Sequence, residues 1–275
     1  MQQAAHSGQQ SLAFGRPQQA VQQYRRAFDL ALARSDADAV GDIGYDLATA
    51  QLAAGDPAAA LATIQRTRVE LAARSAPDFA ELDLAQAASL HRLGDEVLAD
   101  GWAARAQATA PDQATIARAS YVRGVIADAR GDTAALAAAL SMFRQPAAGK
   151  ALPSADWRAD RDELAARLAL RQDRAADAGS SALAAAALRR QTLDYADMEQ
   201  ALELTARARL QQGDARQAAD LSLQAGESAA ARADTADARA WLAQAMMPGA
   251  DMSTVQAARQ ALDRLRPANN VHRRR

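Results

Sequence analysis

The chain has 275 residues, and its 32 lysines and arginines nearly balance its 33 aspartates and glutamates, which leaves a formal net charge of −1. A general nucleic-acid binder needs a basic excess that this chain lacks, and the absence of cysteine excludes disulfides, zinc–thiolate sites and thiol catalysis. Hydrophobic residues make up 49% of the chain but aromatic residues only 4%, and no apolar run approaches the roughly 20 residues that span a bilayer.

Seven antiparallel helix pairs are predicted along the chain. Six follow one another at residues 2–34, 36–74, 77–109, 111–145, 155–190 and 193–230. The seventh, 234–247 and 251–266, is interrupted by Pro248 and Gly249 and is expected to close the stack.

A turn divides each of the first six pairs. The turn residues recur every 37 to 41 residues, at Gly15, Gly55, Gly94, Gly131, Gln172 and Gly213. The residue after the turn is Arg16, Asp56, Asp95, Asp132, Asp173 or Asp214. Glycine ends a helix without a steric cost at positive φ, and aspartate caps the following helix through its side-chain oxygen. Each turn therefore reads as the end of one helix and the start of the next.

Small side chains recur at fixed distances from these turns. Seven residues before the turn stand Gly8, Ala48, Ala87, Gly124, Ala165 and Ala206. Five residues after it stand Ala20, Ala60, Ala99, Leu136, Asp177 and Ala218, and twelve after it stand Ala27, Thr67, Ala106, Phe143, Ala184 and Ala225. Helices approach closely where their side chains are small, so these positions are predicted to be helix crossing points.

The repeated pattern resembles the tetratricopeptide repeat (TPR) family of bacterial type over nearly the whole chain. The third copy, "AQAASLHRLGDEVLADGWAARAQATAPD" from Ala85 to Asp112, has the small residues, the turn glycine and the closing Pro111 where that family has them. Copies four and five depart from it at Leu136 and Asp177, and the repeats exceed the family's usual length. The resemblance implies an all-α, right-handed solenoid of about seven antiparallel helix pairs.

The domain organisation follows from this map. Repeats one to four are expected at residues 1–145 and repeats five to seven at 155–266, with a basic flexible tail at 267–275. The segment 146–154 holds the chain's only lysine, Lys150, and is either a surface loop or a joint between two half-solenoids.

No residues form a recognisable catalytic or metal-binding constellation. His6, His91 and His272 are scattered, and neither a His-Glu-x-x-His motif, a phosphate-binding glycine loop nor a Gly-x-Ser-x-Gly elbow occurs. An acidic cluster reads either as a cation site or as a helix start favoured by the helix dipole, and its members are Asp156, Asp160, Asp162 and Glu163. Three tryptophans read as packing residues: Trp102, Trp157 and Trp241. We therefore expect a protein that is not an enzyme and carries no cofactor or metal.

The first helices of the repeats supply the candidate binding residues. The resemblance implies that these helices line a concave groove that holds a peptide or a partner's helix, at Asp42, Tyr45, Thr49, Leu52, Leu84, Ala88, His91, Arg92, Arg118, Tyr121, Val125, Asp128, Glu203 and Arg207. Tyr45 and Tyr121 both lie ten residues before their turns, where they serve either in recognition or in packing between repeats. A clamp for a carboxy-terminal carboxylate is not expected, since its lysines and asparagines are missing from the groove.

Two functions follow from the resemblance. The first is a protein-interaction scaffold or adaptor; by analogy with bacterial TPR proteins of this size, it would serve in an envelope assembly. The alternative is a regulatory solenoid that senses a ligand or peptide. The N-terminus as written lacks an export signal, which fits a cytoplasmic protein, and it equally fits a trimmed periplasmic or outer-membrane lipoprotein. The partner, the compartment and the oligomeric state are left open.

Overall fold

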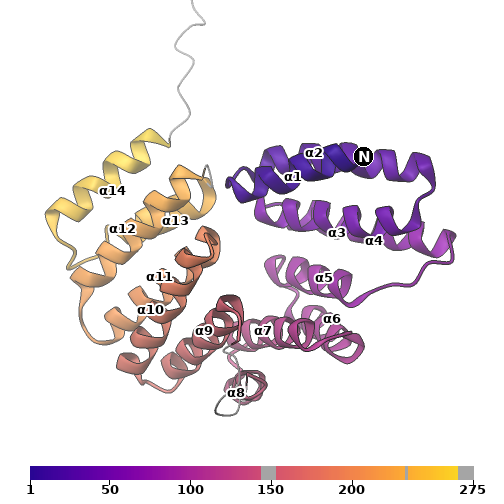
Figure 1. The fold of residues 1–275 in the computed structure, drawn as a ribbon. Helices are drawn as coiled ribbons and strands as arrows, with labels where there is room; N and C mark the ends of the chain where they lie inside the picture. The colour runs from indigo at the N-terminus through magenta and orange to yellow at the C-terminus, as the bar shows by residue number, and fades with distance from the viewer. Residues whose placement is uncertain (144–152, 233–234, 266–275) are drawn as a thin grey trace, which may run out of the picture. The chain divides into compact units, whose positions relative to one another are not determined.

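The computed structural model describes residues 1–143, 153–232 and 235–265. Within these ranges it contains fourteen α-helices and no strand, so the predicted all-α fold of helix pairs is confirmed (Figure 1). Among the described residues, no helix is long and apolar enough to cross a membrane. The chain divides into two compact units, unit 1 (Met1–Leu168) and unit 2 (Ala169–Arg275), and each is treated by itself below.

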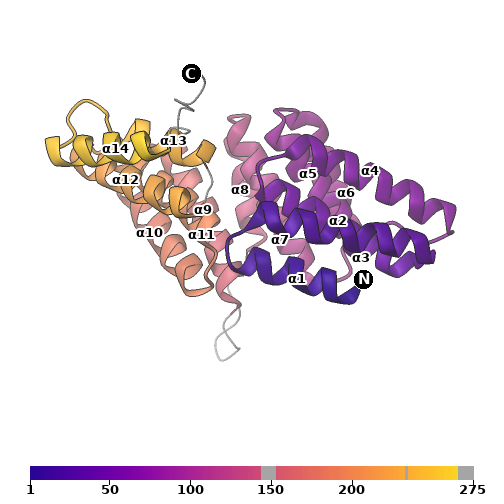
Figure 2. The same ribbon diagram turned by 90° about the horizontal axis from the view of Figure 1, so that it is seen from above.

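The helix bounds agree with the predicted pairs. Unit 1 contains α1 (Gln2–Ala13), α2 (Pro17–Arg34), α3 (Ala37–Ala53), α4 (Pro57–Ala73), α5 (Ala80–Arg92), α6 (Glu96–Thr109), α7 (Gln113–Ala129), α8 (Thr133–Ser141) and most of α9 (Ala155–Arg171). Unit 2 contains α10 (Ala175–Gln191), α11 (Tyr195–Gln211), α12 (Ala215–Ala231), α13 (Thr235–Gln244) and α14 (Met252–Arg264). We call the first helix of each repeat the A helix (α1, α3, α5, α7, α9, α11) and the second the B helix (Figure 2).

The turns between A and B helices are built as predicted in four repeats. The turn glycines have positive φ, for example 79° at Gly55 and 83° at Gly94. The aspartate that follows accepts a hydrogen bond from the backbone N–H three residues later, as Asp56 does from Ala59 at 2.9 Å and Asp95 from Leu98 at 3.2 Å. Equivalent caps at Asp132 and Asp214 start α8 and α12. In the first repeat Arg16 gives no side-chain cap, and Pro17 opens α2.

The fifth repeat is one residue out of the predicted register. Asp173 has the positive φ of 56° that was assigned to Gln172, because aspartate is one of the few non-glycine residues that enter the left-handed region at low cost. Arg174 then stands at the N-cap of α10 without a side-chain cap, so the predicted cap by Asp173 is wrong.

The corrected register restores the pattern of small crossing residues in the fifth repeat. Counted from Asp173, the three positions are occupied by Ala166, Ala178 and Ala185, and all three are buried. The residues predicted there, Ala165, Asp177 and Ala184, are half-buried or exposed. In the other repeats the predicted crossing residues are buried, including Ala20, Ala60, Ala99, Ala106 and Ala225. The predicted departure from the repeat pattern at Asp177 is therefore wrong.

The fourth repeat fills its crossing points with large side chains. Leu136 and Phe143 are both buried where other repeats carry alanine or threonine. The ring of Phe143 lies 5.2 Å from that of Trp157 at the start of α9, so Trp157 packs within unit 1. Residues 144–152 lie outside the described part of the chain, as do 266–275. The loop or joint at 146–154 and the basic tail therefore stay predictions.

An ion-pair network joins α4, α5 and α6. The guanidinium groups of Arg68 and Arg105 lie over the ring of Trp102, at 4.4 and 4.9 Å from its centroid. Arg68 donates to the buried carboxylate of Asp83 at 2.5 Å, and Arg105 lies 3.1 Å from the same group. Burial raises the pKa of Asp83 in spite of these two cations. The Trp102 ring is thus used inside the fold, as the sequence predicted.

In unit 2, the turn between α10 and α11 carries a perturbed carboxyl group. Asp194 caps α11 by accepting from the backbone N–H of Asp197 at 3.3 Å, and it lies 3.6 Å from the guanidinium of Arg189. Burial, followed by the charge of Asp197, raises the pKa of Asp194 to about 6. The ionised carboxylate at this position therefore lowers the stability of the folded state.

We expect acidification to stabilise this turn. The folded pKa of Asp194 is above the unfolded value, so the folded state binds more protons and the free energy of unfolding rises as pH falls from 7 to 5. The side chain is 38% exposed, which limits the gain to about 1 kcal/mol or less. The variant Asp194→Asn keeps the cap and loses this gain. Urea denaturation of both proteins at pH 7 and pH 5 measures the difference, and equal pH dependence in the two would contradict the assignment.

Candidate functional site

Four A helices of unit 1 present side chains at equivalent positions. Counted back from each turn, the residues at 13, 10 and 6 places lie on one face of the helix, because residues three, four and seven apart share a face. These rows are Asp42, Tyr45 and Thr49 on α3; Glu81, Leu84 and Ala88 on α5; Arg118, Tyr121 and Val125 on α7; and Asp160, Glu163 and Arg167 on α9. Helix α5 packs beside both α3 and α7, so these rows run side by side (Figure 1). We call this surface the A-helix face.

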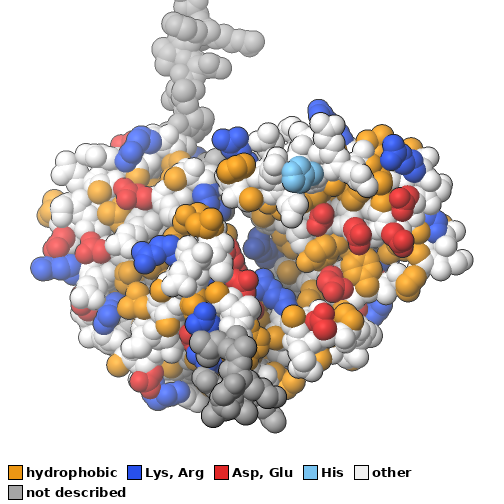
Figure 3. All heavy atoms as spheres, in the orientation of Figure 1, with side chains coloured by type: hydrophobic (Ala, Val, Ile, Leu, Met, Phe, Trp, Pro, Cys, Tyr) orange, Lys and Arg blue, Asp and Glu red, His pale blue; other side chains and the backbone are white. Residues whose placement is uncertain are grey.

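The part of the A-helix face formed by α3 and α5 is acidic. Acidic side chains gather over these two helices in Figure 3. Asp42 is exposed, and Asp46 and Glu81 are half-buried. Burial raises the pKa of Asp46, and the nearby charge of Asp42 raises it further. None of the three carboxylates has an ion-pair partner among the described residues, which leaves this part of the face with an uncompensated negative charge.

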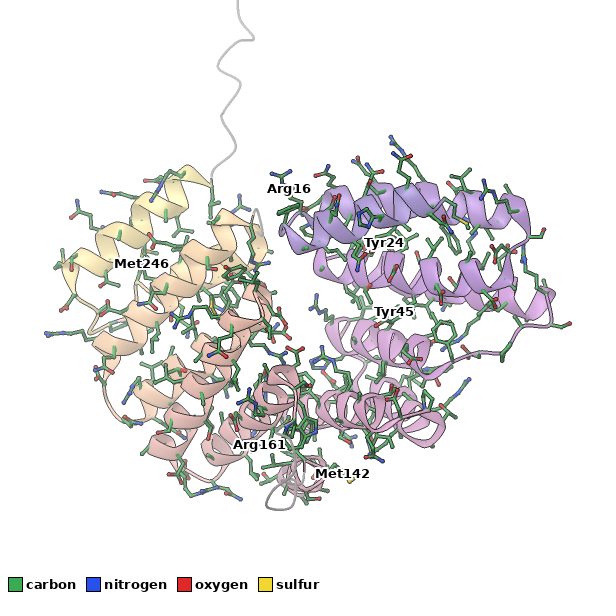
Figure 4. The ribbon with its side chains drawn as sticks, in the orientation of Figure 1. Arg16, Tyr24, Tyr45, Met142, Arg161 and Met246 are labelled. Atoms are coloured by element: carbon green, nitrogen blue, oxygen red, sulfur yellow. The ribbon has the colours of Figure 1, made fainter. Side chains whose placement is uncertain are left out.

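Tyr45 lies in the middle of this acidic part, on the side of α3 next to α5 (Figure 4). Its ring is half-buried and packs against the core cluster formed by α3, α4 and α5. Burial raises the pKa of the phenol, the charge of Arg118 opposes this, and Asp46 and Glu81 add to it. The phenol therefore lies within the field of charged groups from three A helices. Thr49, one turn further along α3, donates to the backbone oxygen of Asp46 at 2.9 Å.

In the part formed by α7 and α9, positive and negative charges are paired. Arg118 donates to Asp160 at 3.2 Å, and its guanidinium lies 4.9 Å from the centroid of the Tyr121 ring. Arg167 donates to Glu163 at 2.7 Å and to Asp128 at 3.1 Å. The Arg118–Asp160 and Arg167–Asp128 contacts join α7 to α9, so they hold two neighbouring repeats together.

The sequence-predicted site residues fall into three groups. Asp42, Tyr45, Thr49, Arg118 and Tyr121 lie together on the A-helix face, and the structure places the Tyr121 ring in the core cluster of α7, α8 and α9 with 7% of its surface exposed. Asp128 is buried and bound by Arg167.

The remaining predicted residues lie elsewhere. His91 Nδ1 is 2.7 Å from Glu96 Oε2 across the turn between α5 and α6, and Arg92 donates to the backbone oxygen of Leu52 at 2.6 Å. Both therefore tie helix ends together. Glu203 and Arg207 are on α11 in unit 2, with 3.9 Å between their charged groups.

Five charged residues of the face were not predicted as site residues: Asp46, Glu81, Asp160, Glu163 and Arg167. The three on α9 were hidden by the register error, because only counting from Asp173 aligns them with the α7 row. The acidic cluster on α9 is divided among arginines, since Asp160 binds Arg118, Glu163 binds Arg167 and Asp162 binds Arg161. In the described part of the chain, no group of three or more His, Cys, Asp and Glu side chains is placed to hold a metal ion.

Comparison with known proteins identifies similar structures but no similar sequence. No family model matches the chain, and no curated protein matches it significantly. The apo form of the quorum sensor NprR from B. thuringiensis is similar in structure, with a TM-score of 0.60, 12% sequence identity, and coverage of 94% of this chain and 79% of that chain. A tetratricopeptide repeat protein from Parabacteroides merdae aligns with a TM-score of 0.49, 14% identity, and coverage of 96% and 98%. At these identities the likeness concerns the fold alone.

Proposed function

Starting from the chain's TPR-like helical-repeat fold, we propose that it is a non-enzymatic interaction scaffold. In this proposal, a peptide or a helix of a partner protein binds along the A-helix face of unit 1. The observation that carries the proposal is that α3, α5 and α7 each carry exposed or half-buried side chains in these rows, among them Tyr45 on α3, Ala88 on α5 and Arg118 on α7. An envelope location for such an assembly stays a prediction by analogy with bacterial TPR proteins of this size.

The dimensions of the face suit a linear segment. Packed helices lie about 8–10 Å apart, so the rows on α3 and α7 are separated by about 20 Å. An extended chain advances about 3.3 Å per residue, so about six residues reach from one row to the other. Such a segment would meet Tyr45 on α3, Ala88 on α5, and Arg118 on α7. Tyrosine and arginine are residue types that often carry the binding energy of an interface.

Site-directed cross-linking tests where the partner binds. We expect a photoreactive residue at position 45 to cross-link a partner, and the same residue at Val69 on the B helix α4, which is 67% exposed, to give no such product. The variant Tyr45→Ala should then weaken the affinity for the identified partner about tenfold or more, because it removes a half-buried aromatic ring from the interface.

A matched variant controls for stability. Tyr24 on the B helix α2 is 3% exposed, so Tyr24→Ala removes the same atoms from the core. Tyr24 is close enough to Asp46 for that charge to raise the pKa of its phenol, and the variant keeps both Asp46 and the Tyr45 ring. We expect Tyr24→Ala to lower the melting temperature and to retain the partner in proportion to the folded fraction. Equal binding by Tyr45→Ala and the wild-type chain would contradict the proposed face.

The alternative function is a regulatory solenoid that senses a ligand or peptide. It is favoured by the structural similarity to a protein described as a quorum sensor. The cross-linking experiment separates the two functions, since a scaffold would yield a folded partner protein and a sensor would yield a small molecule or a short peptide.

A further inference from the structure

We propose that the segment bound by the A-helix face of unit 1 is basic, and that one of its arginine side chains lies over Tyr45 between Asp42, Asp46 and Glu81. This inference rests on the proposed function and names the chemistry of the partner.

The first support is a comparison of two rows within the molecule. On α7, Arg118 lies over the ring of Tyr121 and binds Asp160, which stands on the neighbouring A helix at the position equivalent to its own. On α3, Tyr45 takes the place of Tyr121, and Glu81 on the neighbouring A helix takes the place of Asp160. The position equivalent to Arg118 is Asp42. The α3 row thus has the ring of the α7 row and a carboxylate on the neighbouring A helix, with a second acid, Asp42, where the arginine stands.

The second support is that carboxylates are paired elsewhere on the face but not around Tyr45. Asp160 and Glu163 have guanidinium partners at 3.2 and 2.7 Å. No described cation makes an ion pair with Asp42, Asp46 or Glu81. The positive charge of Arg118 acts on Tyr45 by lowering the pKa of its phenol, and Arg118 is bound to Asp160. A ligand cation would therefore meet carboxylates that the protein does not neutralise itself.

The third support is the partial burial of this acidic group. Burial and the charge of Asp42 both disfavour the ionised form of Asp46. A guanidinium from a partner would favour that form, and its flat face could stack on the Tyr45 ring. Arginine suits this combination better than lysine does, because its planar guanidinium binds a carboxylate through two hydrogen bonds and stacks on a ring. The chain itself places an arginine that binds a carboxylate over a ring at Tyr121, at Trp102 and at Trp157.

A defined peptide tests the proposal on the full-length chain. The probe is a fluorescein-labelled peptide of eight residues in which arginine and alanine alternate, and its control contains citrulline, an uncharged isostere, in place of arginine. Fluorescence anisotropy at 50 and 150 mM salt measures both affinities. We expect the arginine peptide to bind at least about tenfold more tightly than the citrulline peptide, and its affinity to fall at the higher salt, where charges are screened over about 8 Å.

Two charge-matched double variants locate the binding. The double variant Asp42→Asn, Asp46→Asn should lower the affinity for the arginine peptide about fivefold to tenfold, because it removes two carboxylates next to the guanidinium. The control is Asp29→Asn with Glu227→Gln, which removes the same charge from exposed carboxylates on α2 and α12. We expect wild-type affinity from the control. Equal weakening by both double variants would show attraction to the overall charge and would overturn the proposal.

The outcomes also separate this inference from the proposed function. Suppose that Tyr45→Ala lowers the affinity for the cross-linked partner and that the Asp42→Asn, Asp46→Asn variant binds this partner like the wild-type chain. The face would then bind a segment that is not basic, and only this inference would be wrong. If neither variant weakens the partner, both fall. The chain's own residues 266–275 contain four arginines. If replacing Arg273, Arg274 and Arg275 by serine raises the affinity for the arginine peptide about tenfold, these residues compete with the peptide for the face. The proposal that a separate partner supplies the basic segment would then be overturned.

Discussion

Replacing Arg167 by methionine is expected to lower the free energy of unfolding by about 3–5 kcal/mol, which is a large part of the stability of a typical domain. Arg167 is 13% exposed and binds Glu163, whose side chain is 1% exposed, through its Nε and Nη2 at 3.2 and 2.7 Å. Methionine has a similar length and no charge, so the variant leaves an ionised carboxylate buried without its cation. Urea denaturation followed by circular dichroism measures the loss.

A second variant shows whether the loss comes from this charge. In Arg167→Met combined with Glu163→Gln, the buried group is neutral, so about half or more of the lost stability is expected to return. A single variant as stable as the wild-type chain would show that the contacts of Arg167 with Glu163 on α9 and with Asp128 on α7 contribute nothing.

Replacing Gly44 by alanine is expected to cost about 1–3 kcal/mol, because the added methyl group has no room. A Cβ at this position would lie 2.8 Å from Cγ2 of Thr67 and 3.0 Å from its Cβ, and closer still to its Oγ1. Thr67 is fully buried on α4 and donates to the backbone oxygen of Thr63 at 2.9 Å. A β-branched side chain held in this way has little freedom to move aside. The helices α3 and α4 would therefore have to separate.

Gly101 provides the matched control for this substitution. It lies in the exposed part of α6, and no heavy atom lies within 4 Å of its added Cβ. Gly101→Ala is expected to raise stability by about 0.5–1 kcal/mol through helix propensity alone. Thermal and urea denaturation of the two variants should therefore shift in opposite directions. A gain in stability for Gly44→Ala would mean that α3 and α4 are not packed closely at this point.

Much of the fold could be predicted because its signals are local. Each boundary between an A and a B helix is set by a glycine at positive φ and by the aspartate that follows it, which caps the backbone N–H three residues later. These residues are neighbours in the sequence, so the boundaries at Gly55 and Gly94 can be read from it. The fifth repeat failed because Gln172 and Asp173 are both non-glycine residues, and only the burial of Ala166, Ala178 and Ala185 identifies which of them enters the left-handed region.

The candidate site could be predicted only in part, since its charges depend on residues distant in sequence. The repeat period placed Asp42, Tyr45 and Arg118 on one kind of helix. The partners of the arginines are about one repeat away: Arg118 binds Asp160, 42 residues later, and Arg167 binds Asp128, 39 residues earlier. No local pattern specifies which charges of neighbouring helices meet. That Asp42, Asp46 and Glu81 lack an ion-pair partner among the described residues therefore emerges only from the folded chain.

The alanines at the helix crossing points affect how stability depends on temperature. Alanine loses no side-chain rotamer entropy on burial, and it removes little apolar area from water compared with leucine or phenylalanine. The heat-capacity change of unfolding follows the apolar area that unfolding exposes. With Ala20, Ala60 and Ala99 fully buried at the crossing points, this change should be small for the length of the chain. The stability curve should then be flat, so that stability varies little between cold and warm conditions.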